Sequence, residues 1–179
     1  MTNTKKIVIT AMCAALCVVL PFAFHTIPNF GSIFSPMHIP ALLCGLICGW
    51  HYGLLCGIVG PLLASLITGM PAIGYLPPML VELAVYGLIS GLIMKPVRTN
   101  SLFADIYISL VPAMLIGRIL AGLARALIFA PGGSFTYAMW VSSYIVKAIP
   151  GIITHLIVIP LLVIALEKSQ LIPTRYPKK

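Results

Sequence analysis

Charged residues are scarce in this chain of 179 residues, which is 60% hydrophobic and only 8% charged. Soluble domains carry roughly 25% charged residues. Because so few charged side chains cannot cover a water-facing surface, the composition excludes a soluble globular protein. The length predicts one domain, and no break in composition divides residues 1–179, so we expect a single transmembrane domain.

Acidic residues are the scarcest, since three Asp and Glu stand against eleven Lys and Arg, for a net charge of +8. Such a charge can indicate a nucleic-acid partner. Here, however, the basic residues border the apolar runs, at positions 5, 6, 95, 98, 168, 175, 178 and 179. This pattern is typical of loops that face the cytoplasm and anionic lipid, so we expect the bilayer and no nucleic acid as a partner.

Enzyme signatures are also absent. The chain has no H-E-x-x-H, no G-x-S-x-G, no paired carboxylates and no Walker motif. It therefore cannot hydrolyse ATP by itself, and we expect neither an enzyme nor a cofactor. The five cysteines lie inside apolar runs without a C-x-x-C pair or a nearby ligand set, so they are interpreted as packing residues and not as a metal or redox site.

Long apolar runs are what the sequence has in abundance, and they predict an all-α integral membrane protein with six transmembrane helices. The first run follows a basic start, as in a signal peptide, but no cleavage site and polar mature region follow it, so we interpret it as a retained span. The second run is short, and we expect it to be tilted or shielded by its neighbours. The expected spans cover residues 6–24, 37–50, 53–68, 79–94, 104–129 and 137–166.

Six spans place both termini on one side of the membrane. The loops on the other side, residues 25–36, 69–78 and 130–136, contain no Lys or Arg, whereas the terminal side contains eight. The positive-inside rule therefore predicts that the N- and C-termini are cytoplasmic.

Away from the ends of the expected spans lie four charged residues, namely Glu82, Arg118, Arg125 and Lys147. A charge near mid-membrane costs roughly 2.5–3.5 kcal/mol on insertion scales. One Glu can neutralise only one of three cations, so the remaining positive charge needs water or an anion. Helix rise places Arg118 and Lys147 roughly 15 Å below the outer surface.

These positions predict an outward-facing pocket that favours anions, walled by the last three spans. Arg118 and Arg125 are seven residues apart and share a helix face, as do Trp140, Tyr144 and Lys147. The loops at 25–36 and 69–78 lie on the same side and could close over it. The predicted substrate-binding residues are Arg118, Lys147, Glu82, Arg125, Tyr144, Trp140, His38 and Asn29.

Structural interpretations compete with this one. Arg125 could extend its charge to the outer interface, and Glu82 could pair with Arg125 only to hold two helices together. His38 could be a solvated loop or cap residue, and His155 is interpreted as a packed histidine. Small residues recur four apart at Ala11/Ala15, Gly45/Gly49, Gly53/Gly57 and Gly87/Gly91, which predicts close helix packing.

Several segments carry a resemblance to a known family. They are A-M-C-A-A at 11–15, the block from S-P-M-H-I-P at 35–40 to G-L-L-C-G at 53–57, G-P-L-L-A-S-L-I-T-G-M-P at 60–71, and V-E-L-A-V-Y-G-L-I-S-G-L at 81–92. With them the chain resembles the substrate-binding S components of energy-coupling factor (ECF) transporters. The likeness in motif covers the first half of the chain, and the second half matches in the number and length of spans.

The resemblance implies a vitamin-binding subunit that associates with a transmembrane T component and two cytoplasmic ATPases. It implies that Ala11 and Ala15 face the T component and that the first loop covers an outward pocket. It also implies that the whole subunit topples in the membrane to release its ligand inward.

Two arguments reduce the number of vitamins to consider: the charge of the expected pocket and the resemblance to one branch of the family. A surplus of positive charge disfavours cationic thiamine and favours a carboxylate, which Arg can hold in bidentate fashion. Residues 35–92 look most like the pantothenate-specific branch, so we expect Arg118 and Lys147 to hold the carboxylate and Glu82 to accept from hydroxyl or amide donors. Pyridoxine, riboflavin and niacin remain alternatives, as do a self-sufficient small transporter and a membrane enzyme.

Overall fold

The computed structural model describes residues 1–24, 34–129 and 148–176, and it is all-helical within these ranges. The all-α prediction is thus confirmed for the described part of the chain. The helices in chain order are α1 (Asn3–Ala23), α3 (His38–Cys48), α4 (Trp50–Thr68), α5 (Leu76–Met94), α6 (Leu102–Phe129) and α8 (Ile149–Lys168).

Five of these helices, all except α3, are long and apolar enough to cross a membrane. Helix α3 has 11 residues. It therefore spans about 16 Å, roughly half the thickness of the hydrocarbon core. The six-span topology and the side on which the termini lie stay predictions. The prediction that residues 137–166 form one span is tested only over α8, since residues 130–147 lie outside the described part.

Of the helix boundaries that differ from those expected, two have a clear physical cause. Helix α4 begins at Trp50 and not at Gly53, because a single residue, Gly49, is enough to separate it from α3. Gly49 has φ of 96°, which a residue with a side chain adopts only with strain. Helix α5 begins at Leu76 and not at Met79, because its two prolines occupy the first turn, where no backbone donor is missed.

The short helix α3 lies at the centre of the bundle. It contacts each of the other five described helices, and all of its residues except Ile39 and Ile47 are buried. The expectation that this segment is shielded by its neighbours is therefore confirmed. An apolar helix of this length is more often a buried core element than a lipid-facing span.

Glycines let α3, α4 and α5 approach to backbone contact. A methyl group added at Gly87 would overlap the backbone of Gly53, and one at Gly57 would overlap the backbone of Leu83. Likewise, a methyl group at Gly45 would meet the side chain of Ser90 and the backbone of Gly87. The small-residue spacing at these positions therefore serves internal packing, as small residues do between membrane helices.

The five cysteines, Cys13, Cys17, Cys44, Cys48 and Cys56, are all free and buried. They belong to a core cluster shared by α1, α3 and α4. The thiols of Cys17, Cys44 and Cys48 lie near backbone carbonyls; for example, Cys17 donates to the carbonyl of Met37 over 3.5 Å. Within the described residues, no group of three His, Cys, Asp or Glu side chains could hold a metal ion.

A network of hydrogen bonds joins the chain after α8 to the connection between α5 and α6. Asp105 is fully buried, and its Oδ2 accepts from Arg175 Nε over 2.6 Å and from the Tyr176 hydroxyl over 2.6 Å. Its Oδ1 accepts from the backbone N–H and the hydroxyl of Thr99, each over 2.8 Å. Glu167 accepts from the backbone N–H of Arg175 over 2.6 Å. We call these five residues the C-terminal clamp.

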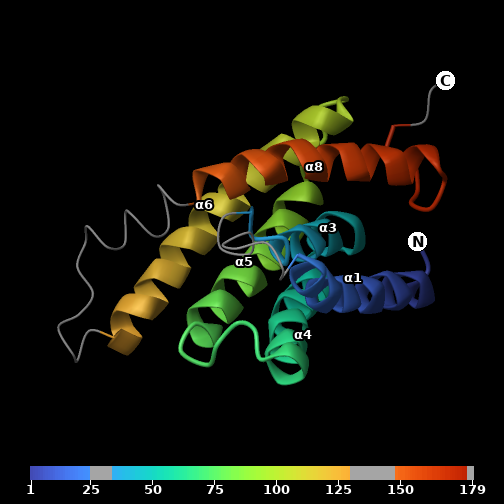
Figure 1. Ribbon diagram of the computed structural model, residues 1–179. Helices are drawn as coiled ribbons and strands as arrows, with labels where there is room; N and C mark the ends of the chain where they lie inside the picture. The colour runs from blue at the N-terminus through green and yellow to red at the C-terminus, as the bar shows by residue number, and fades with distance from the viewer. Residues whose placement is uncertain (25–33, 130–147, 177–179) are drawn as a thin grey trace.

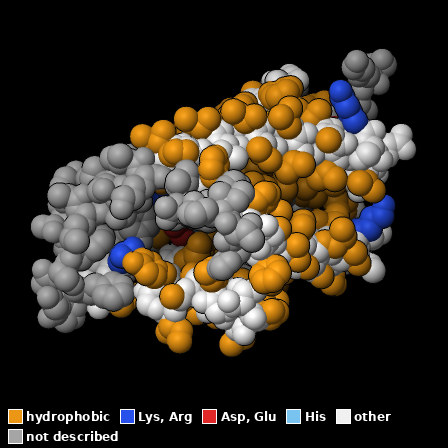
Figure 2. Space-filling model, viewed as in Figure 1, with side chains coloured by type: hydrophobic (Ala, Val, Ile, Leu, Met, Phe, Trp, Pro, Cys, Tyr) orange, Lys and Arg blue, Asp and Glu red, His pale blue; other side chains and the backbone are white. Residues whose placement is uncertain are grey.

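The start of α1 and the end of α8 lie at the same end of the molecule (Figure 1). Apolar side chains cover most of the part of this face that is not grey, and only a few Lys and Arg side chains appear on it (Figure 2). Large apolar side chains are exposed along α1, α4, α6 and α8, as expected of helices whose surroundings are lipid.

The glycine contact between α4 and α5 makes a direct prediction. Gly87→Ala should lower the free energy of unfolding by about 1–3 kcal/mol, because the new methyl group forces the two backbones apart. Thermal unfolding of the purified protein in detergent measures the effect. Gly74→Ala is the matched control, because Gly74 is exposed and a methyl group there meets open space. Equal unfolding temperatures for the two variants would contradict this packing.

The C-terminal clamp gives a second prediction about stability. Arg175→Ala removes the guanidinium donor from Asp105 and from the carbonyl of Met94. It should cost about 1.5–3 kcal/mol, the range for hydrogen bonds to charged groups. Arg98→Ala, at an exposed arginine near the same connection, should have little effect. The comparison uses thermal unfolding in detergent, and a loss as large for Arg98→Ala would show that the clamp has no special role.

Candidate functional site

A buried polar cluster lies where α3, α5, α6 and α8 meet. It contains two histidines that share one backbone carbonyl, together with a carboxylate, a phenol and a guanidinium. Its members are Ser35, His38, Glu82, Tyr86, Arg118 and His155, and we call them the polar cluster.

The carbonyl oxygen of Ser35 is the point at which α3 and α8 are joined. It accepts from the backbone N–H of His38 over 3.0 Å, and it lies 3.2 Å from His38 Nδ1. It also lies 3.2 Å from His155 Nε2. Ser35 has φ of 46°, in the left-handed region that few residues with side chains adopt. Ser35 lies three residues before the first residue of α3, and its carbonyl is turned toward both imidazoles.

Glu82 lies on the opposite side of His38, on α5. Its Oε1 accepts from the Tyr86 hydroxyl over 2.9 Å and lies 3.5 Å from His38 Nε2. Glu82 is 8% exposed and Tyr86 is fully buried. Glu82 and Tyr86 are four residues apart, so one face of α5 supplies both groups.

The acceptors in the cluster fix where protons must lie on His38. A carbonyl oxygen only accepts, so His38 Nδ1 carries a hydrogen for Ser35. The other nitrogen, Nε2, faces Glu82 Oε1, and two lone pairs would repel at this position. One proton therefore lies between His38 and Glu82, and the pair is neutral as a whole.

Arg118 brings the net charge of the cluster. It lies on α6, is 7% exposed, and its guanidinium is close enough to interact electrostatically with Glu82, Tyr86 and His155. Helix α6 approaches α5 closely here, because a methyl group at Gly117 would overlap the ring of Tyr86.

The sequence has few acids to set against the positive charge of Arg118. Only three acidic residues exist in the sequence, and two of them, Asp105 and Glu167, belong to the C-terminal clamp. Glu82 already shares a proton with His38. The cluster thus carries one net positive charge from Arg118, which agrees with a site that favours an anion.

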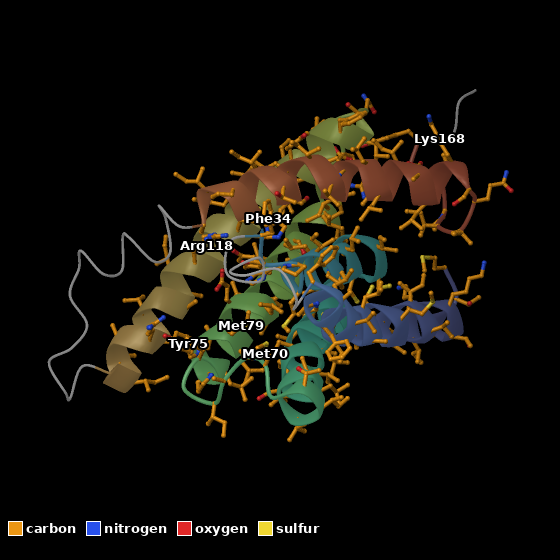
Figure 3. All side chains as sticks on the ribbon, in the orientation of Figure 1. Phe34, Met70, Tyr75, Met79, Arg118 and Lys168 are labelled. Carbon is orange, nitrogen blue, oxygen red and sulfur yellow. The ribbon has the colours of Figure 1, made fainter. Side chains whose placement is uncertain are left out.

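Arg125 is separated from the polar cluster along α6. Its guanidinium carbon lies 4.8 Å from the ring centroid of Tyr75, a cation–π contact. Figure 3 shows Tyr75 beside the C-terminal part of α6, Arg118 farther along that helix, and Lys168 at the opposite end of the molecule. Glu82 forms an ion pair with His38, so an ion pair with Arg125 is not needed to explain the burial of Glu82.

The other predicted residues fall into three sets: those outside the described part of the chain, those in the polar cluster, and the two alanines of α1. Lys147, Tyr144, Trp140 and Asn29 lie outside the described residues. Glu82, Arg118 and His38 are brought together as members of the polar cluster. Ala11 and Ala15, predicted to face a partner, are exposed and one turn apart on α1.

Sequence reasoning missed three members of the cluster, His155, Tyr86 and Ser35. A signal existed for Tyr86, since it follows the buried Glu82 by one helical turn. A histidine deep in an apolar run, such as His155, is a weaker signal, because packing accounts for many of them. No sequence pattern predicts the role of Ser35, because it contributes its backbone carbonyl and not its side chain.

The comparisons with known proteins point to one family. A family model described as "ECF transporter, substrate-specific component" matches residues 5–163, which is most of the chain and includes every member of the polar cluster. Among curated proteins, no relative matches the chain.

Proposed function

Since this chain belongs to the family of substrate-specific components of ECF transporters, we propose that it binds an anionic water-soluble vitamin, pantothenate first of all, at the polar cluster. Membership and its five long apolar helices make it a multi-pass protein of the cell membrane and a transport subunit, not an enzyme. The substrate, the residues that bind it and the partners are the parts we propose.

The net positive charge of the polar cluster is the observation that carries the proposal. A buried guanidinium without a second acid is costly in a membrane, and a carboxylate can offset it. Arg118 can hold two carboxylate oxygens at once, which adds both energy and orientation. Lys147 would add a second cation from the chain before α8. Thiamine is disfavoured because its own positive charge would be repelled.

Pantothenate fits the remaining chemistry of the cluster. It has a carboxylate at one end and hydroxyl and amide groups at the other, so it needs both a cation and hydrogen-bond acceptors. The cluster offers the cation of Arg118 and the carboxylate of Glu82. Niacin supplies a carboxylate without hydroxyl groups, whereas pyridoxine and riboflavin supply hydroxyl groups without a carboxylate.

The proposed orientation places the termini in the cytoplasm and the polar cluster in the outer half of the bundle. Eight basic residues lie on the terminal side, and the expected outer loops have none. Asp105, in the clamp, and Arg118 are 13 positions apart on α6, or roughly 20 Å along its axis. Substrate would thus enter from the side opposite the clamp.

The proposed partners are a transmembrane T component and two cytoplasmic ATPases, because the chain has no nucleotide-binding motif of its own. The exposed Ala11 and Ala15 leave a shallow strip on α1, where another helix can approach closely. Cys13, Ala14 and Cys17 of the same helix are buried against the bundle, so the alanines are turned away from it.

Binding to purified protein tests the site. Arg118→Ala and Lys147→Ala should each weaken pantothenate binding about tenfold to a hundredfold, the equivalent of roughly 1.5–3 kcal/mol for a hydrogen bond to a charged group. Isothermal titration calorimetry in detergent gives the dissociation constants. Lys168→Ala, a basic residue at the far end of α8, is the control and should bind as the unchanged protein does (Figure 3). Unaltered affinity in both site variants would rule out this assignment.

Substitution of the alanines tests the partner surface. Ala11→Leu with Ala15→Leu should abolish co-purification with the T component and the ATPases, because bulky side chains keep a partner helix at a distance. Pantothenate binding by the isolated subunit should not change. Val8→Leu, at an exposed position on the same helix, is the matched control. Normal assembly of the double variant would show that another surface makes this contact.

A further inference from the structure

His155 has a polar atom for which the described structure provides no partner. The side chain is fully buried on α8, and its Nε2 is 3.2 Å from the carbonyl oxygen of Ser35. Its other nitrogen, Nδ1, is also buried, and none of the described residues forms a hydrogen bond with it. The imidazole is fixed in orientation, because its ring also stacks on that of His38 with centroids 5.8 Å apart.

The contact with Ser35 determines what Nδ1 can do. Because the carbonyl only accepts, Nε2 of His155 carries the hydrogen. A second hydrogen, on Nδ1, would place another buried charge beside Arg118. His155 is therefore neutral, and Nδ1 presents a lone pair that can only accept.

A buried acceptor without a donor lowers stability, so such atoms usually have a function. The charged and titratable neighbours of His155 are His38 on α3, Glu82 on α5 and Arg118 on α6. The hydrogens of His38 are directed to Ser35 and Glu82. Nδ1 thus adds an acceptor to the site that contains the net cation.

We propose that His155 Nδ1 accepts a hydrogen bond from a hydroxyl or amide N–H of the bound substrate. The inference rests on the proposed function and deepens it, since it requires a substrate with two features, an anionic group for Arg118 and a hydrogen-bond donor for His155. His155 is then a specificity-determining residue. A substrate-sized anion without such a donor, such as nicotinate, would leave Nδ1 unsatisfied in the closed site.

Discrimination by a polar site is strong in this situation. A site built to bind a hydroxyl or N–H group rejects an analogue without it far better than an apolar pocket rejects an additional methylene. His155 would in this way separate pantothenate, which has two hydroxyls and an amide N–H, from simpler carboxylates of similar charge.

Two isosteric substitutions separate the two nitrogens of His155. In His155→Gln the side-chain amide reaches the position of Nε2, so the bond to Ser35 can persist while the acceptor at Nδ1 is lost. In His155→Asn the shorter amide lies near the position of Nδ1, so the acceptor persists and the bond to Ser35 is lost. Unfolding temperatures without ligand show that each variant is folded.

The experiment measures the affinity of the unchanged protein and both variants for pantothenate and for three analogues. These analogues lack in turn each hydroxyl hydrogen-bond donor and, by N-methylation, the amide N–H. We expect His155→Gln to weaken pantothenate binding about tenfold and to bind one analogue as well as pantothenate. We expect His155→Asn to keep the preference for pantothenate over that analogue. If His155→Gln keeps every preference of the unchanged protein, the inference is wrong.

Titration of the unchanged protein with pyridoxine, riboflavin and nicotinate separates this inference from the proposed function. Tightest binding of nicotinate overturns the role of His155 but leaves an anionic vitamin as substrate. Binding of pyridoxine or riboflavin without pantothenate overturns the anionic substrate. The role of His155 is then tested by the affinity of His155→Gln for that vitamin. An affinity weaker by about tenfold supports the role, and an unchanged affinity overturns it. Binding of none of the four vitamins overturns both.

Discussion

The carbonyl oxygen of Ser35 receives donors from two helices that are far apart in the sequence, and the polar cluster depends on this one acceptor. Because this oxygen takes one nitrogen of each ring, the other nitrogen of His38 faces Glu82, and the other nitrogen of His155 can accept a hydrogen bond. The left-handed conformation of Ser35 is required, because it turns the carbonyl toward both rings. A change in the backbone just before α3 would therefore alter the protonation pattern of the whole cluster, although Ser35 contributes no side-chain contact to it.

The shortage of acids explains how the two polar networks differ. The clamp contains two acids, Asp105 and Glu167, against one cation, Arg175, so its net charge is negative, and backbone N–H groups donate to both carboxylates. The polar cluster contains only Glu82, and the proton shared with His38 removes that charge from the balance. A chain with one more acid near α6 could have neutralised Arg118 internally. The same scarcity of acids that excluded a soluble fold therefore supports the proposal that the cluster binds an anion.

The sequence was sufficient to predict what depends on local pattern and on charge. Apolar runs located the helices, and the cost of a charge in a membrane selected Glu82 and Arg118 before any geometry was known. It could not predict that α3 and α8 meet, because periodicity indicates which face of a helix is buried but not which helix covers it. His155 was interpreted as packing for this reason, since its partner is a carbonyl 120 residues earlier. The start of α5 was placed too late because prolines were treated as breakers, although the first turn tolerates them.

Packing at the centre of the bundle determines how the site can respond to a ligand. Glycines hold α3, α4 and α5 at backbone contact, so His38 and Glu82 cannot move apart without separating whole helices. A binding site that is rigid before the ligand arrives loses less free energy on binding, and its selectivity follows from groups already in position. Arg118 and His155 lie on α6 and α8, which complete the site from outside this glycine-packed core. In the proposed binding mode the cation and the acceptor come from these two helices, so a ligand that satisfied both would add a link between them.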